Sequence, residues 1–365
     1  MKSTAAMLRT APGALTLETI EVDAPAETEV RVKTSAVGLC HSDLHIIRGH
    51  NRRPLPMVLG HEAVGEVVDV GSQVTHVRPG DRVIACLSEH CGWCEYCLSG
   101  RLFLCDRADL ARPPGRPPRL SQSGDTVHAG FGIGAFSEYF LVHQSAVTAV
   151  PDPLPHEYAA LLGCAVVTGM GAVFHTAQVR PGETMAVVGC GGIGLSAIQA
   201  GRIAGAGIIA AFDTDRAKFS KALKLGATHV FDPTRPEDLA EFRKLTGGVD
   251  HGFDAVGGPT VAASTFSLLR KGGTCTLIGM PAEDDNYTLP AMPLLMGRRV
   301  QGSLMGSNRF PIDIPRYARM ALSGDLDLQS MLAKTVTLSE LEATYQGMDS
   351  GSAGRTVLVF DEESR

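Results

Sequence analysis

Four cysteines crowd one short stretch of the sequence. The segment CGWCEYCLSGRLFLC spaces them with two, two and seven intervening residues. A structural zinc ion takes four thiolates in a tetrahedron, and cysteines two residues apart can approach one ion from a single turn. Buried thiols without a metal and an iron–sulfur cluster are the alternatives, but no other part of the sequence signals electron transfer. We therefore expect a structural zinc lobe over residues 91–105, held by Cys91, Cys94, Cys97 and Cys105.

A second motif, VVGCGGIGLSAIQ, has glycines at the spacing G-x-G-x-x-G. Gly189 permits a tight turn, Gly191 lets the backbone approach a pyrophosphate, and Gly194 lets a helix and a strand pack closely. The helix that begins with Gly192 and Ile193 would direct its amide donors at the phosphates. A glycine-rich turn without a cofactor is the alternative, but the predicted strand before the motif and the predicted helix after it favour a dinucleotide.

The type of dinucleotide is indicated by Asp213, 19 residues after Gly194 at the end of the next predicted strand. A carboxylate there accepts hydrogen bonds from the ribose hydroxyls and repels a 2′-phosphate. Arg216 lies nearby and would act in the opposite sense, but Asp213 should dominate. The sequence therefore predicts NAD rather than NADP.

The elements that position these motifs change character along the chain. The first ~160 residues predict a β-rich domain, with strands such as Glu29–Val37 and Ala63–Val70. Strands and helices then alternate from about Pro155 to Met305, which predicts a parallel sheet with helices on both faces. The expected elements are strands at 184–188, 208–212, 229–231, 252–254 and 274–278, and helices at 193–204 and 216–225. A last strand, Thr356–Phe360, does not continue the alternation and could return to the first domain.

Composition agrees with a globular enzyme. The chain has 365 residues, 44% hydrophobic and 20% charged, with a formal net charge of −6 that does not suggest a nucleic-acid partner. No apolar run reaches the ~18 residues of a membrane helix, and the N-terminus lacks a signal core. We therefore expect a cytoplasmic protein. In such a reducing compartment, clustered cysteines are metal ligands more often than disulfides. The proline-rich segment Ala111–Arg119 predicts an exposed loop.

Taken together, the motifs resemble those of zinc-containing alcohol dehydrogenases of the medium-chain dehydrogenase/reductase superfamily. The resemblance covers essentially the whole chain and rests on GHEAVGEV, CHSDLH, the four-cysteine lobe, GCGGIG, LLGCAVVTG and GRTVLVF. It implies an α/β protein with a GroES-like β-rich catalytic domain over residues 1–165 and 305–365. A Rossmann domain with a doubly wound parallel sheet would occupy residues 166–304.

The resemblance also implies a catalytic zinc on Cys40, His61 and Cys164. Three protein ligands leave one position open for substrate, and the ion lowers the pKa of a coordinated hydroxyl, which eases hydride loss to nicotinamide. A buried thiol without a metal is the alternative for Cys164. Two zinc ions per chain would follow, one catalytic and one structural.

Further roles follow from the same resemblance. Asp43 would orient the ligating His61, and Glu62 would assist ligand exchange at the metal. Ser42 would contact the substrate oxygen, and His45 would pass its proton through the ribose to solvent. A surface histidine is the alternative for His45.

Cofactor contacts beyond the glycine turn are also implied. His41 stands where many relatives have an arginine at the pyrophosphate, and Arg355 matches a second pyrophosphate-binding arginine. Thr168 is assigned to the cofactor site as well. Lys218 matches a lysine near the adenosine ribose, with a solvated helix charge as the alternative.

The substrate channel is expected to be apolar, which favours a primary aliphatic or aryl alcohol as the small-molecule partner. Its residues would be Leu87, Leu110, Phe131, Met280 and Leu304. A thiol-adduct-dependent formaldehyde dehydrogenase is the nearest competitor. Glutathione-dependent relatives carry acidic residues where this chain has Asn51 and Arg53, which argues against glutathione. Arginines of the 111–119 segment (Arg112, Arg116 and Arg119) could meet the carboxylate of another carrier, although a solvated loop is the simpler interpretation.

Two other classes are disfavoured: a zinc-free quinone or enone reductase, and a protein that kept the fold without activity. The reductases usually lack the three ligands Cys40, His61 and Cys164, which are present here. A protein without activity would be expected to lose Cys40, His61 or Ser42, and none of these is lost. The long stretch from Cys105 to Cys164 resembles that of dimeric relatives. It favours a homodimer formed through Val300–Met305, with a tetramer as the alternative.

Overall fold

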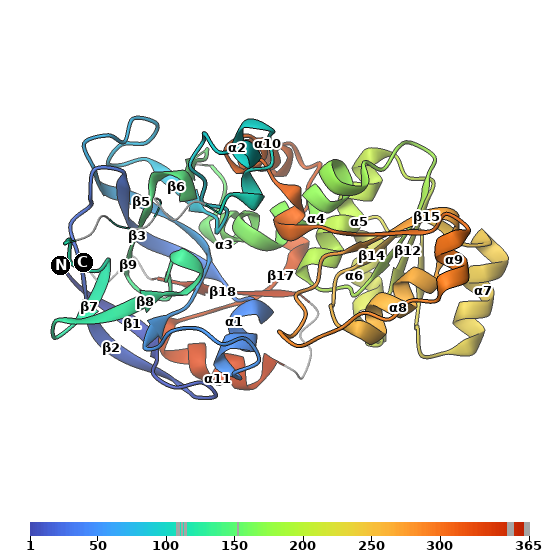
Figure 1. Ribbon diagram of the computed structural model, residues 1–365, viewed down its shortest axis with the longest axis horizontal. Coiled ribbons are helices and arrows are strands. Elements are labelled where there is room, and N and C mark those ends of the chain that lie inside the picture. Colours follow the sequence, from blue (N-terminus) through green and yellow to red (C-terminus); the bar gives the residue numbers. More distant parts are fainter. Residues whose placement is uncertain (107–109, 111, 113–114, 152, 349–353, 361–365) are drawn as a thin grey trace. The chain divides into compact units, whose positions relative to one another are not determined.

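The computed structural model describes residues 1–106, 110, 112, 115–151, 153–348 and 354–360 (Figure 1). The chain divides into two units. The first comprises Met1–Cys164 and Arg309–Arg365, and the second comprises Ala165–Asn308. Ala111, Pro113 and Pro114 of the proline-rich segment lie outside the described residues.

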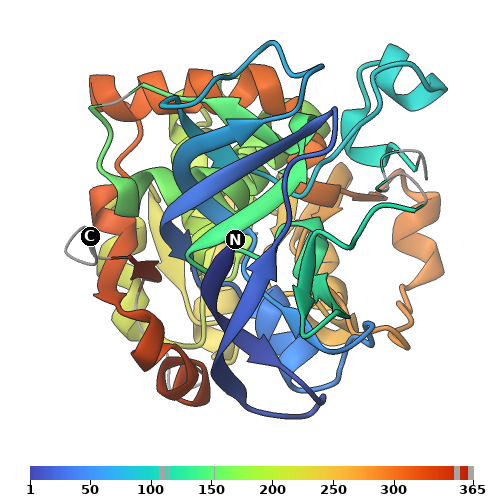
Figure 2. The ribbon, with the colours of Figure 1, turned by 90° about the vertical axis from the view of Figure 1, so that its left-hand side faces the viewer.

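The first unit combines a closed barrel with a seven-stranded sheet. The barrel has the order β1-β2-β7-β8-β4, and the sheet has the order β10-β6-β5-β3-β18-β17, with β9 paired to β3. The barrel strands are β1 (Lys2–Leu8), β2 (Leu15–Val22), β4 (Met57–Val58), β7 (Leu120–Gln122) and β8 (Asp125–Ala129). The sheet strands are β3 (Glu29–Gly38), β5 (Glu62–Val70), β6 (Arg82–Ala85), β9 (Tyr139–His143), β10 (Val147–Ala149), β17 (Leu332–Val336) and β18 (Arg355–Val359). Figure 2 looks onto the blue and green strands of this unit.

Strand β3 lies inside that sheet, where it pairs with β5, β9 and β18. Its side chains alternate between buried and partly exposed positions, as a half-buried strand requires. Val30, Val32 and Ala36 are fully buried, whereas Arg31 and Lys33 between them are partly exposed. The helices of this unit are α1 (His41–Ile47), α2 (Glu95–Leu98), α3 (His156–Leu161), α10 (Phe310–Ser323) and α11 (Leu341–Gln346).

The C-terminal strand β18 pairs antiparallel with β3, with Val357 opposite Gly38, and parallel with β17. The sequence predicted this strand one residue later than it lies. Its return to the first unit is confirmed by the pairing. The return brings residues near position 355 beside residues near position 40, which matters for the site below.

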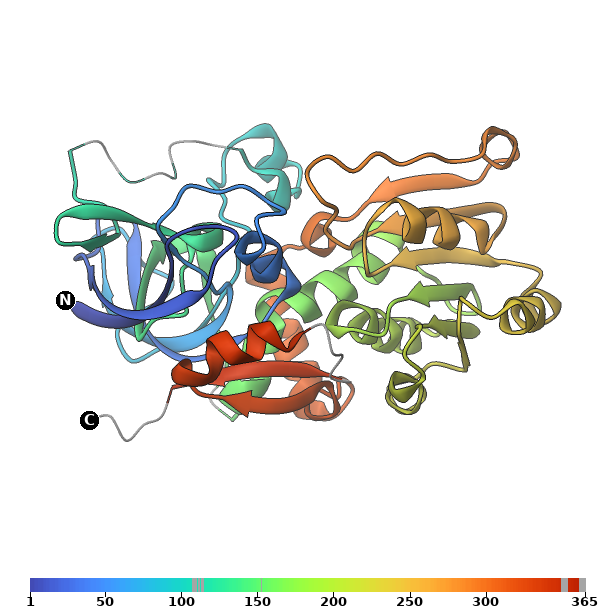
Figure 3. The same ribbon diagram turned by 90° about the horizontal axis from the view of Figure 1, so that it is seen from below.

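The second unit is a six-stranded parallel sheet with the order β13-β12-β11-β14-β15-β16. Its strands are β11 (Thr184–Val188), β12 (Ile208–Phe212), β13 (His229–Phe231), β14 (Val249–Asp254), β15 (Leu269–Leu277) and β16 (Arg299–Gly302). Its helices are α4 (Val167–Gly171), α5 (Gly192–Ala204), α6 (Phe219–Lys224), α7 (Pro236–Thr246), α8 (Pro259–Ser267) and α9 (Ala291–Leu295). The order of the strands reverses at β11, as in a doubly wound Rossmann sheet, and Figure 3 shows helices on both sides of the strands.

The predicted parallel sheet is therefore confirmed. The expected strands at 184–188, 208–212 and 229–231 have the observed bounds. The expected helix 216–225 is divided, because Arg216–Lys218 form a 3₁₀ turn before α6. The side chain of Asp215 caps that turn by accepting from the amide of Ala217.

One helical stretch, His156–Ala177, is long and apolar enough by composition to cross a membrane, with a mean hydropathy of 1.6. However, 83% of the apolar window is buried inside the protein. A buried core helix meets the same criterion, so this is weak evidence for a membrane span. Two π-helical turns, Leu162–Val166 and Ala172–Ala177, interrupt this stretch.

Candidate functional site

A buried cluster of cysteine, histidine and glutamate side chains lies in the first unit. The ligand atoms of Cys40, His61, Glu62 and Cys164 all lie within 4.8 Å of one another. Cys40 precedes the first turn of α1, and His61 lies directly before β5. Cys164 lies on the π-helical turn Leu162–Val166, a departure from α-helical geometry that is frequent at functional sites.

A glycine is required directly before His61. Gly60 has φ +91, and a Cβ at this position would lie 2.7 Å from the backbone nitrogen of Phe136. Any other residue would clash there and would also be strained by the positive φ. The GHE sequence thus fixes the direction in which the chain presents His61 to the cluster.

The imidazole of His61 presents one nitrogen to the cluster and the other to a carboxylate. Its Nδ1 lies 3.2 Å from Asp43 Oδ1, while its buried Nε2 has no hydrogen-bond partner among the described residues. Burial opposes a charged ring, but the negative charges of Asp43 and Cys40 raise the pKa of His61 well above its usual value. A metal ion on Nε2 would supply the positive charge that these groups favour, so the donor set fits a cation.

The charges around the cluster support the same interpretation. A hydrogen bond with Cys164 lowers the pKa of the Cys40 thiol well below its usual value. Burial raises the pKa of Glu62 to about 7, although the guanidinium of Arg355 binds its Oε1. The cluster thus brings two sulfurs, one imidazole and the Glu62 carboxylate together beside one buried guanidinium. Two sulfurs and one imidazole suit zinc.

The other side chains predicted for this site lie along α1. The Cys40 thiol donates to Ser42 Oγ at 3.6 Å, which places the hydroxyl beside the cluster. His45 is half-buried in the last turn of α1, and His41 is exposed at its start. These positions alone do not test the roles in proton transfer and cofactor binding, so the roles of Ser42, His45 and His41 stay predictions.

Three of the predicted substrate-pocket residues belong to the first unit. The Phe131 ring packs 4.5 Å from the His61 ring, and Phe131 adopts a left-handed backbone with φ +53. Leu87 packs against the core of this unit, and the carbonyl of Leu110 accepts a hydrogen bond from Arg119. Met280 and Leu304 belong to the second unit, where both side chains are exposed. A pocket shared by all five stays a prediction.

The four cysteines of the 91–105 lobe also converge. Cys97 Sγ lies 3.8 Å from Cys91 Sγ and 3.5 Å from Cys94 Sγ, and Cys94 Sγ lies 3.9 Å from Cys105 Sγ. Thiolates at about 2.3 Å from a tetrahedral zinc would be separated by roughly 3.8 Å. Backbone amides of Cys94 and Cys91 donate to the sulfurs of Cys91 and Cys105, which suits thiolate charge. The lobe therefore fits a structural zinc ion.

In the second unit, the glycine motif forms the turn between β11 and α5. Gly189 has φ +96, and a Cβ on Gly194 would lie 1.7 Å from the carbonyl oxygen of Gly189. A Cβ on Gly191 would meet no heavy atom within 4 Å, so the backbone is open on that side. Gly192 and Ile193 form the first turn of α5. This is the arrangement that presents helix amides to a pyrophosphate.

Asp213 follows β12 directly, as predicted. Its Oδ2 accepts from the amide of Cys190 at 2.8 Å, and its Oδ1 accepts from the amide of Asp215 at 2.9 Å. Lys218 Nζ lies 3.3 Å from both oxygens, so its charge is held beside the carboxylate rather than in open solvent. Thr168 is buried in this unit and donates to Met305 Sδ at 3.7 Å.

Two contacts of the buried cluster were not predicted from the sequence. Arg355 was assigned to a pyrophosphate, but its guanidinium is buried and paired with Glu62; the pyrophosphate contact stays a prediction. Tyr345 was not singled out, yet its hydroxyl lies 3.4 Å from Asp43 Oδ2. No local pattern could have identified either contact, because the partners are about 300 positions apart.

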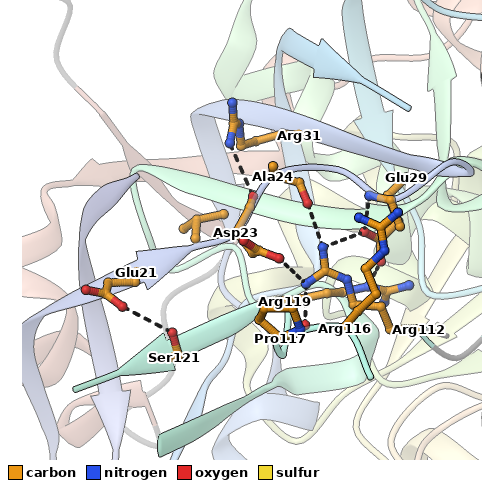
Figure 4. A network of polar contacts seen from close by, with 12 residues as sticks. Glu21, Asp23, Ala24, Glu29, Arg31, Arg112, Arg116, Pro117, Arg119 and Ser121 are labelled. Carbon is orange, nitrogen blue, oxygen red and sulfur yellow. Dashed lines mark hydrogen bonds and ion pairs between the residues drawn. The ribbon is translucent and has the colours of Figure 1, made fainter. Parts of the chain in front are cut away.

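The expectation of an exposed, solvated loop at 111–119 is wrong for two of its arginines, Arg112 and Arg119. The side chains of Arg112 and Arg119 are 9% and 15% exposed, and both bind the buried Glu29 (Figure 4). Arg112 also pairs with Asp23 at 2.8 Å. The guanidinium groups of Arg112 and Arg119 thus bind carboxylates of the first unit, which holds these two residues against it. Only Arg116, paired with Glu27, keeps substantial exposure among these three arginines.

Comparison with known proteins places the chain in a family. Residues 26–152 match the family model of an alcohol dehydrogenase GroES-like domain, and residues 192–320 match that of a zinc-binding dehydrogenase. The chain is 36% identical to an S-(hydroxymethyl)glutathione dehydrogenase from Escherichia coli O6:H1, covering 99% of this chain and 100% of that protein.

Solved structures agree with the sequence comparison. An alcohol dehydrogenase zinc-binding domain protein from Burkholderia ambifaria matches with a TM-score of 0.92 at 30% identity. A benzyl alcohol dehydrogenase from Acinetobacter calcoaceticus matches with a TM-score of 0.92 at 26% identity. Both matches cover 99% of this chain and 100% of the other chain.

Proposed function

This chain belongs to the zinc-containing alcohol dehydrogenase family of the medium-chain dehydrogenase/reductase superfamily, and we propose that it catalyses the reversible, NAD-linked oxidation of an apolar primary alcohol. The observation that carries the proposal is the convergence of Cys40, His61 and Cys164, with an unpartnered His61 Nε2 among them. Zinc held by these three residues would supply a Lewis acid that lowers the pKa of an alcohol hydroxyl and so favours hydride loss to nicotinamide.

The chain's own side chains would handle the proton of the alcohol. The Ser42 hydroxyl, beside Cys40 Sγ, would accept a hydrogen bond from the substrate hydroxyl. His45, one helical turn further along α1, would take the proton toward solvent, because an imidazole can change its charge near neutral pH. Asp43 holds the Nδ1 side of His61 and so keeps Nε2 available to the metal.

NAD is proposed as the cofactor because Asp213 lies at the end of β12, where a carboxylate would bind ribose hydroxyls and repel a 2′-phosphate. Lys218 offsets part of that negative charge, since its Nζ lies 3.3 Å from Asp213 Oδ1. The turn from Gly189 to Gly194 would bind the pyrophosphate, with Thr168, His41 and Arg355 as further proposed contacts.

An aryl or aliphatic alcohol is proposed as substrate. Phe131 offers apolar surface beside His61, and the relative from Acinetobacter calcoaceticus is a benzyl alcohol dehydrogenase. Such surface favours an apolar substrate by about 25 cal/mol per Å² buried and excludes water from the reacting atoms.

A thiol-adduct-dependent formaldehyde dehydrogenase is the second candidate, favoured by the 36% identity to an S-(hydroxymethyl)glutathione dehydrogenase. The charges of this chain argue against it. Arg112 and Arg119 are already neutralised by Asp23 and Glu29, so they would have to break buried ion pairs to bind a carrier carboxylate.

We further propose two zinc ions per chain, a homodimer and a cytoplasmic location. The lobe of four cysteines supports the second ion. The β16 strand ends the six-stranded sheet and pairs only with β15 among the described strands, which supports pairing with a second copy along Val300–Met305. None of the nine cysteines, all of which lie among the described residues, forms a disulfide, in keeping with a reducing compartment.

The proposal is tested by counting zinc and by following NADH absorbance with aliphatic, aryl and terpenoid alcohols, and with formaldehyde plus glutathione. We expect two zinc ions and turnover of apolar alcohols with NAD. Cys40→Ser should lose one zinc and nearly all turnover, whereas Cys86→Ser, a buried thiol outside the cluster, should keep both. Near-normal activity of Cys40→Ser would refute the ligand assignment, and activity confined to the glutathione adduct would favour the second candidate.

A further inference from the structure

Tyr345 reaches the buried cluster from the far end of the chain. It lies on α11 (Leu341–Gln346), is 1% exposed, and directs its hydroxyl to Asp43 Oδ2 at 3.4 Å across 302 positions of sequence. Its ring packs edge-on against Phe136, with ring centroids 6.0 Å apart. The side chain is therefore fixed at both its apolar body and its polar tip.

The Asp43 carboxylate receives donors from three directions. Oδ1 accepts from the amide of Gly60 at 3.3 Å and lies 3.2 Å from His61 Nδ1. Oδ2 is the oxygen that Tyr345 binds, and it also lies 3.2 Å from His61 Nδ1. Because Asp43 is completely buried, water is not available to replace a lost donor, and the orientation of the carboxylate depends on these partners.

The same hydroxyl oxygen faces the backbone amide of Cys40. A phenol, whose ordinary pKa is about 10, carries its proton at neutral pH and can donate it to the Asp43 carboxylate. The Tyr345 hydroxyl thus contacts both Cys40, which would bind the metal through its sulfur, and Asp43, which would orient the imidazole of His61.

A ligating histidine is a better metal ligand when its second nitrogen donates to a well-oriented carboxylate. A tilt of Asp43 would turn the His61 ring and move Nε2 away from the sulfurs. We propose that Tyr345 is a positioning residue that acts through Asp43 to hold His61 in the orientation for metal binding, a role that rests on the proposed function of Cys40, His61 and Cys164 as zinc ligands.

The chain offers a matched control. Tyr317 of α10 is also buried, at 3% exposure, but its hydroxyl has no hydrogen-bond partner among the described residues. Tyr317→Phe therefore removes a buried hydroxyl of the same kind from the same unit without touching Asp43. The zinc of the cysteine lobe serves as a second, internal control for metal release.

The experiment measures release of each zinc to a chromogenic chelator from the full-length wild type, Tyr345→Phe, Tyr317→Phe, Asp43→Asn and the double variant Tyr345→Phe/Asp43→Asn. We expect Tyr345→Phe to speed release of one zinc by about 3- to 10-fold, less than the loss for direct partners of a ligating histidine. Release of the other zinc, and both rates in Tyr317→Phe, should stay at wild-type values. In the Asp43→Asn background the added substitution should have little effect, because it acts through the same carboxylate.

Wild-type release of both ions from Tyr345→Phe, or an equal effect of that substitution with and without Asp43, would overturn the role of Tyr345 while leaving the ligands intact. A wild-type chain that holds only the lobe zinc would instead reject the ligand assignment, and the role of Tyr345 with it. Cobalt substitution gives a separate readout, since a displaced imidazole would alter the d–d absorption of Tyr345→Phe but not of Tyr317→Phe.

Discussion

The guanidinium of Arg355 and the carboxylate of Glu62 form a buried ion pair, although 293 positions separate them in the chain. The pair exists because β18 returns beside β3, so that Arg355 at the start of β18 meets Glu62 at the start of β5. Gly38, on the intervening strand, leaves room for the carboxylate, since a Cβ there would lie 2.3 Å from Glu62 Oε2. The ion pair of Arg355 and Glu62 thus links β18 to β5 across β3.

Arg355→Met should destabilise the protein by about 3–5 kcal/mol, because it leaves the Glu62 carboxylate buried without a cation. The double variant Arg355→Met/Glu62→Gln should recover part of that loss, since it buries no unpaired charge. The midpoint of thermal denaturation, followed by circular dichroism, measures both effects. Equal stability of the single and double variants would contradict a role for the pair in folding.

Asp213→Gly should weaken the preference for NAD over NADP by about tenfold or more, because the carboxylate that repels a 2′-phosphate is removed. The ratio of kcat/KM values with the two cofactors measures the change. Asp232→Gly is the control, since Asp232 follows β13 as Asp213 follows β12 but bonds to Thr234 instead. If the cofactor ratio is the same in Asp213→Gly and in the wild type, Asp213 does not set the preference.

The sequence predicted best those parts of the fold that short-range patterns determine. The strand 184–188 is an apolar run that a glycine turn ends, and its bounds follow from that run alone. The cysteine lobe is equally local, since its four cysteines lie within 15 residues and need no distant element to converge. Cys40, His61 and Cys164, which the structure brings together, were predicted through family motifs rather than through periodicity.

Contacts between distant segments could not be predicted in this way. Neither Tyr345 nor Arg355 carries a local signal for its partner, because each contact depends on how the C-terminal segment returns to the first unit. The error over the 111–119 segment has the same origin. Composition gave no indication that Glu29 is buried opposite Arg112 and Arg119.

Glu29→Gln should destabilise the first unit by about 3 kcal/mol, because it leaves Arg112 and Arg119 without their shared buried carboxylate. Arg116→Ala should leave the urea midpoint close to the wild-type value, since its pair with Glu27 is exposed to solvent on both sides. Urea denaturation of the two variants provides the comparison. Similar midpoints for both would show that the network in Figure 4 does not anchor the segment.

Stability should also fall between pH 6.5 and pH 4 because of His143, at the end of β9. Burial, with a contribution from the positive charge of Arg119, lowers the pKa of His143 from 6.5 to about 4. Within this range the unfolded chain binds a proton that the folded chain does not, so stability is lost as the pH falls. The groups that act on the ring are Arg119, His90, Glu29 and His76.

His143→Gln should therefore reduce the pH dependence of the urea midpoint between pH 6.5 and 4.5. The reduction corresponds to less than about 1.4 kcal/mol per pH unit, since at most one proton is involved and solvent screens a half-buried ring. Ser145→Ala removes the hydroxyl that lies 2.8 Å from His143 Nδ1 but keeps the imidazole, so it should lower stability without changing the slope. A slope in His143→Gln as steep as in the wild type would assign the acid sensitivity to other groups.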